Sequence, residues 1–227
     1  MQKTLTSDNQ TAFAAQALEE WAGVNGVEIT DAQFAALAEY QARVLDVNRH
    51  MNLTRITDSA EFAVKHIIDA MTLLPLIPQG VSLCDIGTGA GFPGMVLRIM
   101  RGDLQITLLD SLRKRVNFLR DAAEMLGVQA ECIHSRAEDH VRTHAAYYDI
   151  CTARAVAAMD KLVAYALPLI KPGGIFLAMK NPDISEEIEN AKPAIKKYGG
   201  RVEQIKIVQI ADGLEHSIVV IRKFNPV

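Results

Sequence analysis

Residues 84–94 read CDIGTGAGFPG and stand between a short apolar run and an amphipathic stretch. This spacing predicts a glycine-rich loop directly after a strand at 81–86 and before a helix. Glycines permit positive φ and let the backbone approach a ligand closely. In an open α/β sheet the ligand crevice lies beyond the carboxyl ends of the strands, where such a loop is found. The stretch therefore predicts an α/β fold with a ligand site at this loop; a tight turn whose glycines serve packing alone is the alternative.

Downstream of the loop, short apolar runs alternate with amphipathic stretches, which is typical of βαβ units and a mostly parallel sheet. The expected further strands cover 106–110, 131–134, 148–153 and 175–180. Two final strand-like runs, 202–210 and 216–222, flank Asp212 and Gly213, a pair that favours a hairpin. We expect a mostly parallel sheet with an antiparallel C-terminal hairpin.

The chain upstream of the loop has helical periodicity instead. One helix is expected to begin at a cap on Asp31, a second at the Asp58-x-x-Glu61 capping box, and a weaker one covers 11–24. The second helix has an apolar face, with Lys65, His66 and Asp69 toward its edges. A helical extension at 1–78 and an α/β domain at 79–227 are therefore predicted.

Composition describes an ordinary soluble globular protein: of 227 residues, 49% are hydrophobic and 22% charged, which excludes disorder, collagen and coiled-coil arrays. The net charge of −3 lacks the strong basic field that would by itself indicate nucleic acid. Three cysteines, each within an apolar run, favour a reducing cytoplasm. Apolar stretches fall short of the ~20 residues that span a bilayer, and the N-terminus does not resemble a signal peptide, so no membrane partner is expected.

The ligand of the loop is not decided by glycines alone, because Gly89-x-Gly91-x-x-Gly94 also satisfies the dinucleotide fingerprint. Pro93 removes a backbone donor that a pyrophosphate would use. Asp85 is an anion, which is unfavourable beside phosphates and favourable beside a cation. S-adenosylmethionine carries a sulfonium and an ammonium and no phosphate, so the loop suits it better. A nicotinamide-dependent oxidoreductase remains the alternative.

Two further acidic segments follow the next strands. Asp110 ends the run 106–110, where a carboxylate accepts from ribose hydroxyls, although a helix N-terminal acid has the same appearance. After the third strand, Glu138 and Asp139 are candidates to accept from an adenine amino group, or are solvated loop acids. These positions favour a nucleoside-containing cofactor.

An ordered set of motifs covers roughly residues 48–180: Asn52-Leu53-Thr54, Lys65 to Ala70, Asp85 to Gly94, Leu109 to Arg115, Ser135 to Glu138, and Thr152 to Ala155. In these the sequence resembles the ribosomal RNA small subunit methyltransferase G family, also called glucose-inhibited division protein B. The resemblance implies a class I S-adenosylmethionine-dependent methyltransferase fold, which is Rossmann-like. It also implies methyl transfer to ring nitrogen 7 of a guanine in 16S rRNA or the small ribosomal subunit.

The family's cofactor contacts correspond to Gly87, Phe92, Ala137, Glu138 and Arg154. Together with the residues singled out above, the predicted cofactor site comprises Asp85, Gly87, Gly89, Gly91, Phe92, Asp110, Ala137, Glu138 and Arg154. Arg154, after the fourth strand, is also the predicted catalytic residue; a surface salt bridge is its plain alternative.

Guanine nitrogen 7 has an exposed lone pair, so its methylation needs no general base and depends on positioning. The segment 152–155 lacks the Asn/Asp-Pro-Pro-aromatic motif of exocyclic amine methylation, and Cys151 lies within a strand, which disfavours a cysteine nucleophile. Two alternatives remain open: ribose 2′-hydroxyl methylation with Lys180 as the base, and a non-catalytic module that senses the cofactor and binds RNA.

Basic residues from several elements are candidates for RNA contact: Arg49, His50, Arg55, Lys65, Arg113, Lys114 and Arg115, with Arg154. His66 is interpreted as a solvated or core histidine, with at most a role in RNA contact or in the substrate pocket. His134, His140 and His144 have no ligand-like partners at useful spacing, so no metal is predicted.

Overall fold

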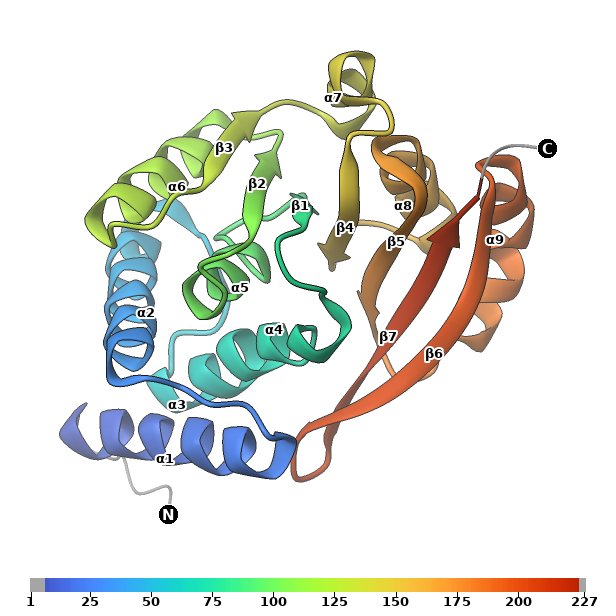
Figure 1. Ribbon diagram of the computed structural model, residues 1–227. Helices are drawn as coiled ribbons and strands as arrows, with labels where there is room; N and C mark the ends of the chain where they lie inside the picture. The colour runs from blue at the N-terminus through green and yellow to red at the C-terminus, as the bar shows by residue number, and fades with distance from the viewer. Residues whose placement is uncertain (1–6, 225–227) are drawn as a thin grey trace.

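A seven-stranded sheet forms the centre of the computed structural model, which describes residues 7–224 (Figure 1). The strand order is β3-β2-β1-β4-β5-β7-β6. The strands are β1 (Ser82–Ile86), β2 (Gln105–Asp110), β3 (Glu131–His134), β4 (Tyr148–Arg154), β5 (Ile170–Lys180), β6 (Gly200–Ala211) and β7 (Leu214–Lys223).

The strand directions confirm the predicted sheet. β1 pairs in parallel with β2 and with β4, and β2–β3 and β4–β5 are parallel as well. β7 pairs antiparallel with both β5 and β6, which makes the C-terminal hairpin an antiparallel edge. β5 begins at Ile170, earlier than predicted, because its pairing with β4 extends past a register shift between Tyr148 and Ile150.

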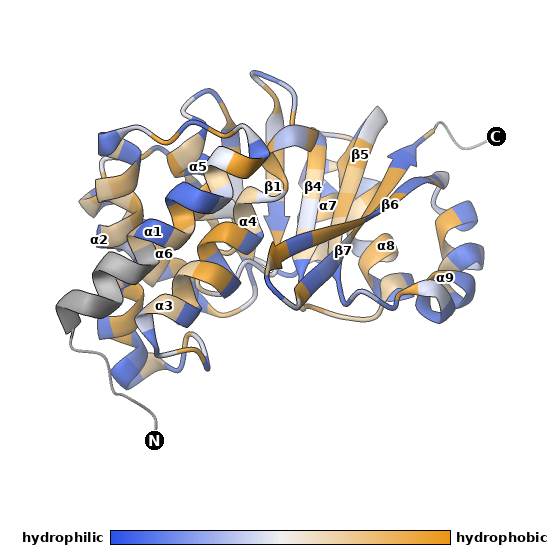
Figure 2. Ribbon diagram, turned by 90° about the horizontal axis from the view of Figure 1, so that it is seen from below, coloured by the Kyte–Doolittle hydropathy of each residue, from blue (hydrophilic) through white to orange (hydrophobic). Residues whose placement is uncertain are grey.

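Helices cover both faces of the sheet (Figure 2). Their bounds are α1 (Ser7–Asn25), α2 (Asp31–Met51), α3 (Ser59–Phe62), the π-helix η1 (Ala63–Ile68), α4 (Asp69–Met71), the 3₁₀ turn η2 (Leu74–Leu76), α5 (Gly94–Met100), α6 (Arg113–Met125), α7 (Ala137–His144), α8 (Met159–Ala166), the 3₁₀ turn η3 (Leu167–Leu169) and α9 (Ser185–Lys197). One buried cluster joins α1 to α6 with one face of the sheet, and a second joins α7, α8 and α9 with the other.

The N-terminal helices share a core with the sheet. Leu37, Tyr40 and Phe62 are fully buried and belong to the same cluster as Met95 and Leu119 of the βαβ region. These helices are therefore fixed against the glycine loop side of the sheet. The proposed domain boundary at residue 78 stays a prediction.

Two local predictions for these helices are corrected by the structure. The N-cap of α2 is Thr30, whose side chain accepts from the backbone N–H of Gln33 in a capping box, and Asp31 is the first helical residue. The second helix is not regular, because residues 63–68 form a π-helix. The wider π turn changes which side chains face inward. His66 and Asp69, expected at the edges of the apolar face, are buried.

Candidate functional site

The glycine loop is shaped by Asp85, near the end of β1. Its Oδ2 atom accepts from the Thr88 hydroxyl at 2.6 Å and from the backbone N–H of Gly94 at 2.8 Å. Burial raises the pKa of Asp85 to about 6, although these two hydrogen bonds act to lower it. The side chain is fully buried and does not line the cavity above the loop. The structure thus shows Asp85 supporting the loop, and its contact with the cofactor stays a prediction.

The loop glycines serve different purposes. Gly91 has φ +89°, and a Cβ there would overlap the Tyr40 hydroxyl and lie 2.9 Å from Leu119 Cδ2. The Tyr40 hydroxyl donates to the carbonyl of Ala90, so α2 packs directly on the loop. Gly89, with φ +62°, has no atom nearer than 3.9 Å to such a Cβ. Gly91 is therefore required by packing, whereas Gly89 is required by backbone conformation.

A cavity of about 180 Å³ lies beyond the carboxyl ends of β1 and β2. Gly87, Asp110, Ala137 and Glu138 all line it, so the structure brings together four of the predicted cofactor residues. Val156 also lines it, and a Cβ on Gly87 would lie 2.7 Å from the Val156 side chain. Small-molecule sites usually enclose roughly 300–1,000 Å³. The segment 155–157 therefore narrows this cavity; its first residue, Ala155, has φ +54°.

Asp110 connects this cavity to the loop. One carboxylate oxygen accepts from the backbone N–H of Gly89 at 2.9 Å, and the other from that of Leu112 at 2.8 Å. Arg115 lies 3.5 Å from the same carboxylate. The side chain thus holds the loop against the start of α6 while it lines the cavity.

Arg154 is the last residue of β4, and its side chain does not form the exposed surface salt bridge that was the alternative to a site role. Its guanidinium donates to the carbonyl of Lys65 at 2.9 Å and to Asp69 Oδ2 at 2.7 Å. It also lies 3.0 Å from His66 Nδ1 and 5.4 Å from the centroid of the Phe92 ring. Arg154 therefore joins the end of β4 to the π-helix and to the glycine loop.

His66 completes this contact as a neutral ring. Burial, together with the charge of Arg154, lowers the pKa of His66 to about 3. Its Nε2 atom lies 2.8 Å from the Thr54 hydroxyl, and the ring stacks on Phe92 with centroids 4.6 Å apart. With Nδ1 facing a guanidinium that only donates, the proton is assigned to Nε2. His66 is thus a buried, hydrogen-bonded residue that packs on the buried Phe92 ring, and its role in RNA contact or in the substrate pocket stays a prediction.

Sequence reasoning missed Asp69 and His216 as site residues. His216 Nδ1 lies 2.5 Å from Asp69 Oδ1, and its Nε2 lies 3.1 Å from the Thr72 hydroxyl. Burial alone would raise the pKa of Asp69, but the hydrogen bond from His216 and the charge of Arg154 lower it below its usual value. Asp69 and His216 are separated by 147 residues, so no local sequence pattern indicates their contact. The one available signal was the presence of His66 and Asp69 at the edges of an apolar helix face.

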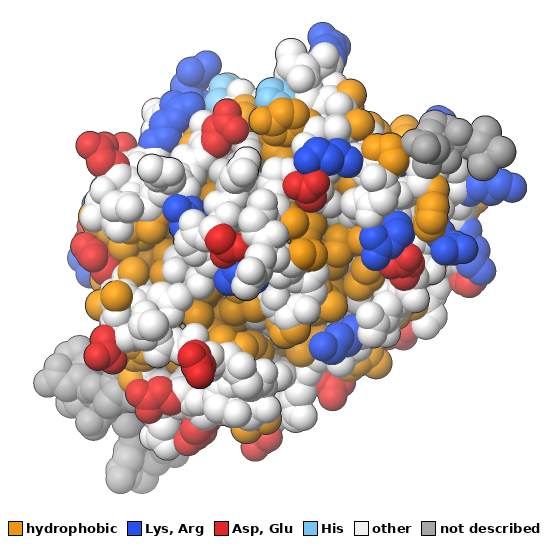
Figure 3. All heavy atoms as spheres, viewed as in Figure 1, with side chains coloured by type: hydrophobic (Ala, Val, Ile, Leu, Met, Phe, Trp, Pro, Cys, Tyr) orange, Lys and Arg blue, Asp and Glu red, His pale blue; other side chains and the backbone are white. Residues whose placement is uncertain are grey.

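The predicted RNA-contact residues divide into two groups. Arg49, Arg55 and Arg115 line a groove of about 1,130 Å³, together with Asn52 and Thr54. The other candidates do not line this groove; Lys65 pairs with Glu61 at 2.6 Å, and Arg113 and Lys114 are exposed at the start of α6. Basic and acidic side chains are mixed over the face seen in Figure 3, in agreement with the small net charge.

The side chain of Lys180, at the end of β5, donates hydrogen bonds to two neighbouring acceptors. Its ammonium donates to the carbonyl of Ala157 at 2.7 Å and to Glu187 Oε1 at 2.5 Å. An ammonium has no lone pair with which to take a proton. This arrangement disfavours Lys180 as a general base.

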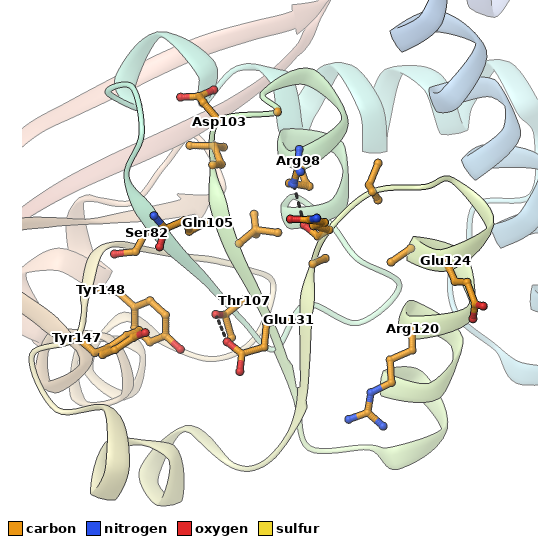
Figure 4. Close-up of a pocket in the computed structure, with 17 residues that line it drawn as sticks. Ser82, Arg98, Asp103, Gln105, Thr107, Arg120, Glu124, Glu131, Tyr147 and Tyr148 are labelled. Atoms are coloured by element: carbon orange, nitrogen blue, oxygen red, sulfur yellow. Dashed lines mark hydrogen bonds between the residues drawn. The ribbon is translucent and has the colours of Figure 1, made fainter.

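Another cavity, of about 680 Å³, lies at the amino ends of the strands (Figure 4). Three of its polar side chains already have protein partners: Arg98 donates to the carbonyl of Gln129, Arg120 to that of Cys132, and Thr107 to Glu131. It is remote from the glycine loop, and we assign it no role.

Within the part of the chain that the structure describes, no three His, Cys, Asp or Glu side chains group as metal ligands would. Over the same residues, no helix has the length and apolar character needed to cross a membrane. Metal independence remains a prediction.

Comparison with known proteins agrees with the site. The family profile described as rRNA small subunit methyltransferase G matches residues 33–218. The Ribosomal RNA small subunit methyltransferase G of Lactobacillus delbrueckii subsp. bulgaricus is 46% identical over 184 residues, covering 78% of this chain and 77% of the relative. That of Pelotomaculum thermopropionicum is 43% identical over 217 residues, covering 93% and 91%.

Solved structures share the fold at low identity. TYW2 from Pyrococcus horikoshii in complex with MeSAdo superposes with a TM-score of 0.58 at 17% identity, covering 70% of this chain and 62% of that one. A SAM-dependent methyltransferase from Aquifex aeolicus gives 0.53 at 17% identity, covering 69% and 90%. The observed strand order is therefore that of a class I methyltransferase sheet.

Proposed function

The chain belongs to the rRNA small subunit methyltransferase G family, and from this premise we propose that it methylates ring nitrogen 7 of a guanine in 16S rRNA, in the cytoplasm. S-adenosylmethionine is the cofactor. The observation that carries the proposal is the cavity at the ends of β1 and β2, lined by Gly87, Asp110, Ala137 and Glu138, with Arg154 at the adjacent strand end.

The residues of this cavity fit the cofactor. Asp110 and Glu138 supply carboxylates that suit ribose hydroxyls and an adenine amino group, and Gly87 leaves room for close backbone approach. A phosphate-bearing dinucleotide fits less well, since Pro93 lacks an N–H at the start of α5 and the acidic Asp110 lines the cavity. Outward movement of Val156 would enlarge the cavity. When bound, S-adenosylmethionine supplies an electrophilic methyl group on a sulfonium.

The protein's contribution to the reaction is positioning and exclusion of water. Nitrogen 7 of guanine attacks with its own lone pair, so no side chain has to remove a proton. Arg154 is fixed by Asp69, His66 and the Lys65 carbonyl, which holds it where donor and substrate sites adjoin. We assign it the orientation of substrate and donor, a contribution that such fixed contacts make to catalysis.

The alternatives have less support. Ribose 2′-hydroxyl methylation with Lys180 as base conflicts with its two acceptors, Glu187 and the Ala157 carbonyl. A non-catalytic module that senses the cofactor would have the same site contacts as the enzyme and would differ only in that it transfers no methyl group. The oxidoreductase is disfavoured by the family to which the chain belongs.

RNA would approach along the groove lined by Arg49, Arg55 and Arg115. These side chains come from α2, the segment after it, and α6, and they adjoin Ala155 next to Arg154. Sequence-selective RNA enzymes read unstacked bases. We therefore assign this groove to backbone phosphates beside an exposed guanine.

Calorimetric titration tests the cofactor assignment. S-adenosylmethionine is expected to bind the purified protein and NAD is not. Asp110→Ala should weaken S-adenosylmethionine binding at least about tenfold, the loss expected for hydrogen bonds to a charged acceptor. Preference for NAD would contradict the assignment, and unchanged affinity in Asp110→Ala would remove the ribose role of Asp110.

A further inference from the structure

The cavity assigned above to S-adenosylmethionine, called here the donor cavity, lies at the ends of β1 and β2, and a second cavity of about 300 Å³ lies at the next pair of strands, β4 and β5. It is lined from the ends of β4 and β5, the start of α9, β7 and the π-helix side, by Asp69, Arg154, Lys180, Asn181, Glu187 and His216. The segment 155–157 separates the two sites, because Ala155 lines this cavity while Val156 and Ala157 line the other. A ligand here would contact Arg154, which directly precedes that segment in the chain.

Arg154 offers unused donors to this cavity. A guanidinium has five N–H groups. Three of them face the Lys65 carbonyl, Asp69 and His66, so two have no partner among residues 7–224. With a side chain only 19% exposed, Arg154 is a fixed donor of hydrogen bonds to acceptor atoms of a ligand.

Glu187 offers an unused acceptor on the β5 side of the cavity. Its Oε1 atom accepts from Lys180 Nζ at 2.5 Å and from the backbone N–H of Met159 at 2.6 Å. These two bonds hold the carboxylate in place at the start of α9. Its second oxygen has no hydrogen bond within the described part of the chain, and the side chain is 33% exposed. The carboxylate is thus oriented and still able to accept.

The two unused groups complement guanine. Guanine has acceptors, O6 and N7, on one edge and donors, including the exocyclic amino group, on the opposite side of the base. For N7 to face the donor site, the O6/N7 edge must lie toward β1 and β4, where Arg154 is. The amino group then lies toward β5, where Glu187 is. Adenine has a donor amino group in place of the O6 acceptor and no amino group at position 2, so it cannot accept from Arg154 at position 6 or donate to Glu187 from position 2.

We propose that this cavity receives the target guanine, turned out of its RNA strand, and that Glu187 is the residue that determines specificity by accepting from the base's exocyclic amino group. The inference rests on the proposed function and adds the substrate pocket to it. A site that hydrogen-bonds a substrate group rejects an analogue without that group, because its own polar atom is left unpaired. Turning the base out also gives the methyl donor access to N7.

The test compares Glu187→Gln with wild type on two RNAs. After the modified guanosine has been mapped, 16S rRNA is assembled by ligation with either guanosine or inosine at that position and reconstituted into 30S subunits. Inosine lacks only the amino group. We expect wild-type kcat/KM to fall about 10–100-fold on inosine, and Glu187→Gln to lose a similar factor on guanosine. Combining both changes should cost little more than either, because each removes the same hydrogen bond.

Glu186→Gln, on the exposed neighbour in α9, is the matched control and should act as wild type on both RNAs. Thermal unfolding is followed in parallel. A glutamine at position 187 keeps an oxygen that can accept from Lys180 and from the Met159 N–H. If the variant nevertheless unfolds, the activity of the wild-type protein on the inosine RNA still tests the contact with the amino group. Equal wild-type activity on both RNAs would overturn the guanine pocket but not the proposed function. The same holds if the losses from Glu187→Gln and from inosine multiply fully when the two changes are combined. Absence of any methyl transfer to guanosine-containing subunits would overturn the proposed function with it.

Discussion

Arg154 donates to Asp69 across 2.7 Å, although 85 residues separate them in the chain. The other Asp69 oxygen lies 2.5 Å from Nδ1 of His216 in the C-terminal hairpin, so this one carboxylate connects β4, α4 and β7. The connection fixes the arginine in the lining of the cavity at the ends of β4 and β5. We regard the Asp69 carboxylate as the group that positions Arg154.

Asp69→Asn should therefore impair both folding and turnover. Removal of the carboxylate leaves a largely buried guanidinium without its counter-charge, which costs about 3 kcal/mol. We expect kcat to fall more than cofactor affinity, because Asp69 does not line the donor cavity. Urea unfolding, calorimetry and single-turnover methyl transfer measure the three effects. Glu189→Gln, which breaks the exposed pair with Lys192, is the control and should change none of them.

The loop glycines are distinguished by alanine substitution. Gly91→Ala should lower the free energy of unfolding by several kcal/mol, since its Cβ would collide with the Tyr40 hydroxyl and crowd Leu119. Gly89→Ala meets open space and should cost only the roughly 1–2 kcal/mol of positive φ. Denaturant unfolding of both variants checks the difference. Equal destabilisation would show that α2 does not pack on the loop as described.

The burial of the Asp85 carboxyl leads us to expect that the stability of the protein depends on pH. Its pKa is raised from 3.8 to about 6 by burial, so the folded state favours the protonated carboxyl. The corresponding stability is fully present below pH 3.8 and is lost as the pH rises through about 6. The difference of about two units corresponds to about 3 kcal/mol. Asp85→Asn does not ionise, so wild type should lose about this much stability relative to the variant between pH 4 and pH 8.

Urea titrations at several pH values measure the difference between the two proteins. A constant difference from pH 4 to pH 8 would show that Asp85 does not titrate as its burial implies.

The basic groove predicts a salt effect on RNA binding. Arg55→Gln removes one of the three arginines that line it. Affinity for unmodified 16S rRNA should fall, and the slope of log K against log salt should decrease by about 0.7–0.9 if one phosphate contact is lost. Lys192→Gln on α9 leaves the groove intact and should keep the wild-type slope. Identical slopes for Arg55→Gln and wild type would place the RNA elsewhere.

The sequence patterns predict the features that depend on neighbours in the chain. The strands, the glycine loop and the C-terminal hairpin follow from apolar alternation and turn residues, and all are confirmed. The π-helix was not predicted, because its apolar pattern also suits a regular helix. The link between Asp69 and His216 could not be predicted either, since only the folded sheet brings β7 beside α4. Four of the predicted cofactor residues thus line one cavity, while the contacts that hold this region together could be seen only in the structure.

The most direct measurement is methyl transfer itself. The purified protein is incubated with methyl-labelled S-adenosylmethionine and 30S subunits from cells lacking the gene, and the 16S rRNA nucleosides are separated by mass spectrometry. We expect one new 7-methylguanosine, and none when 7-deazaguanosine replaces the target. Label on a ribose 2′-hydroxyl, or no label despite bound cofactor, would contradict the account.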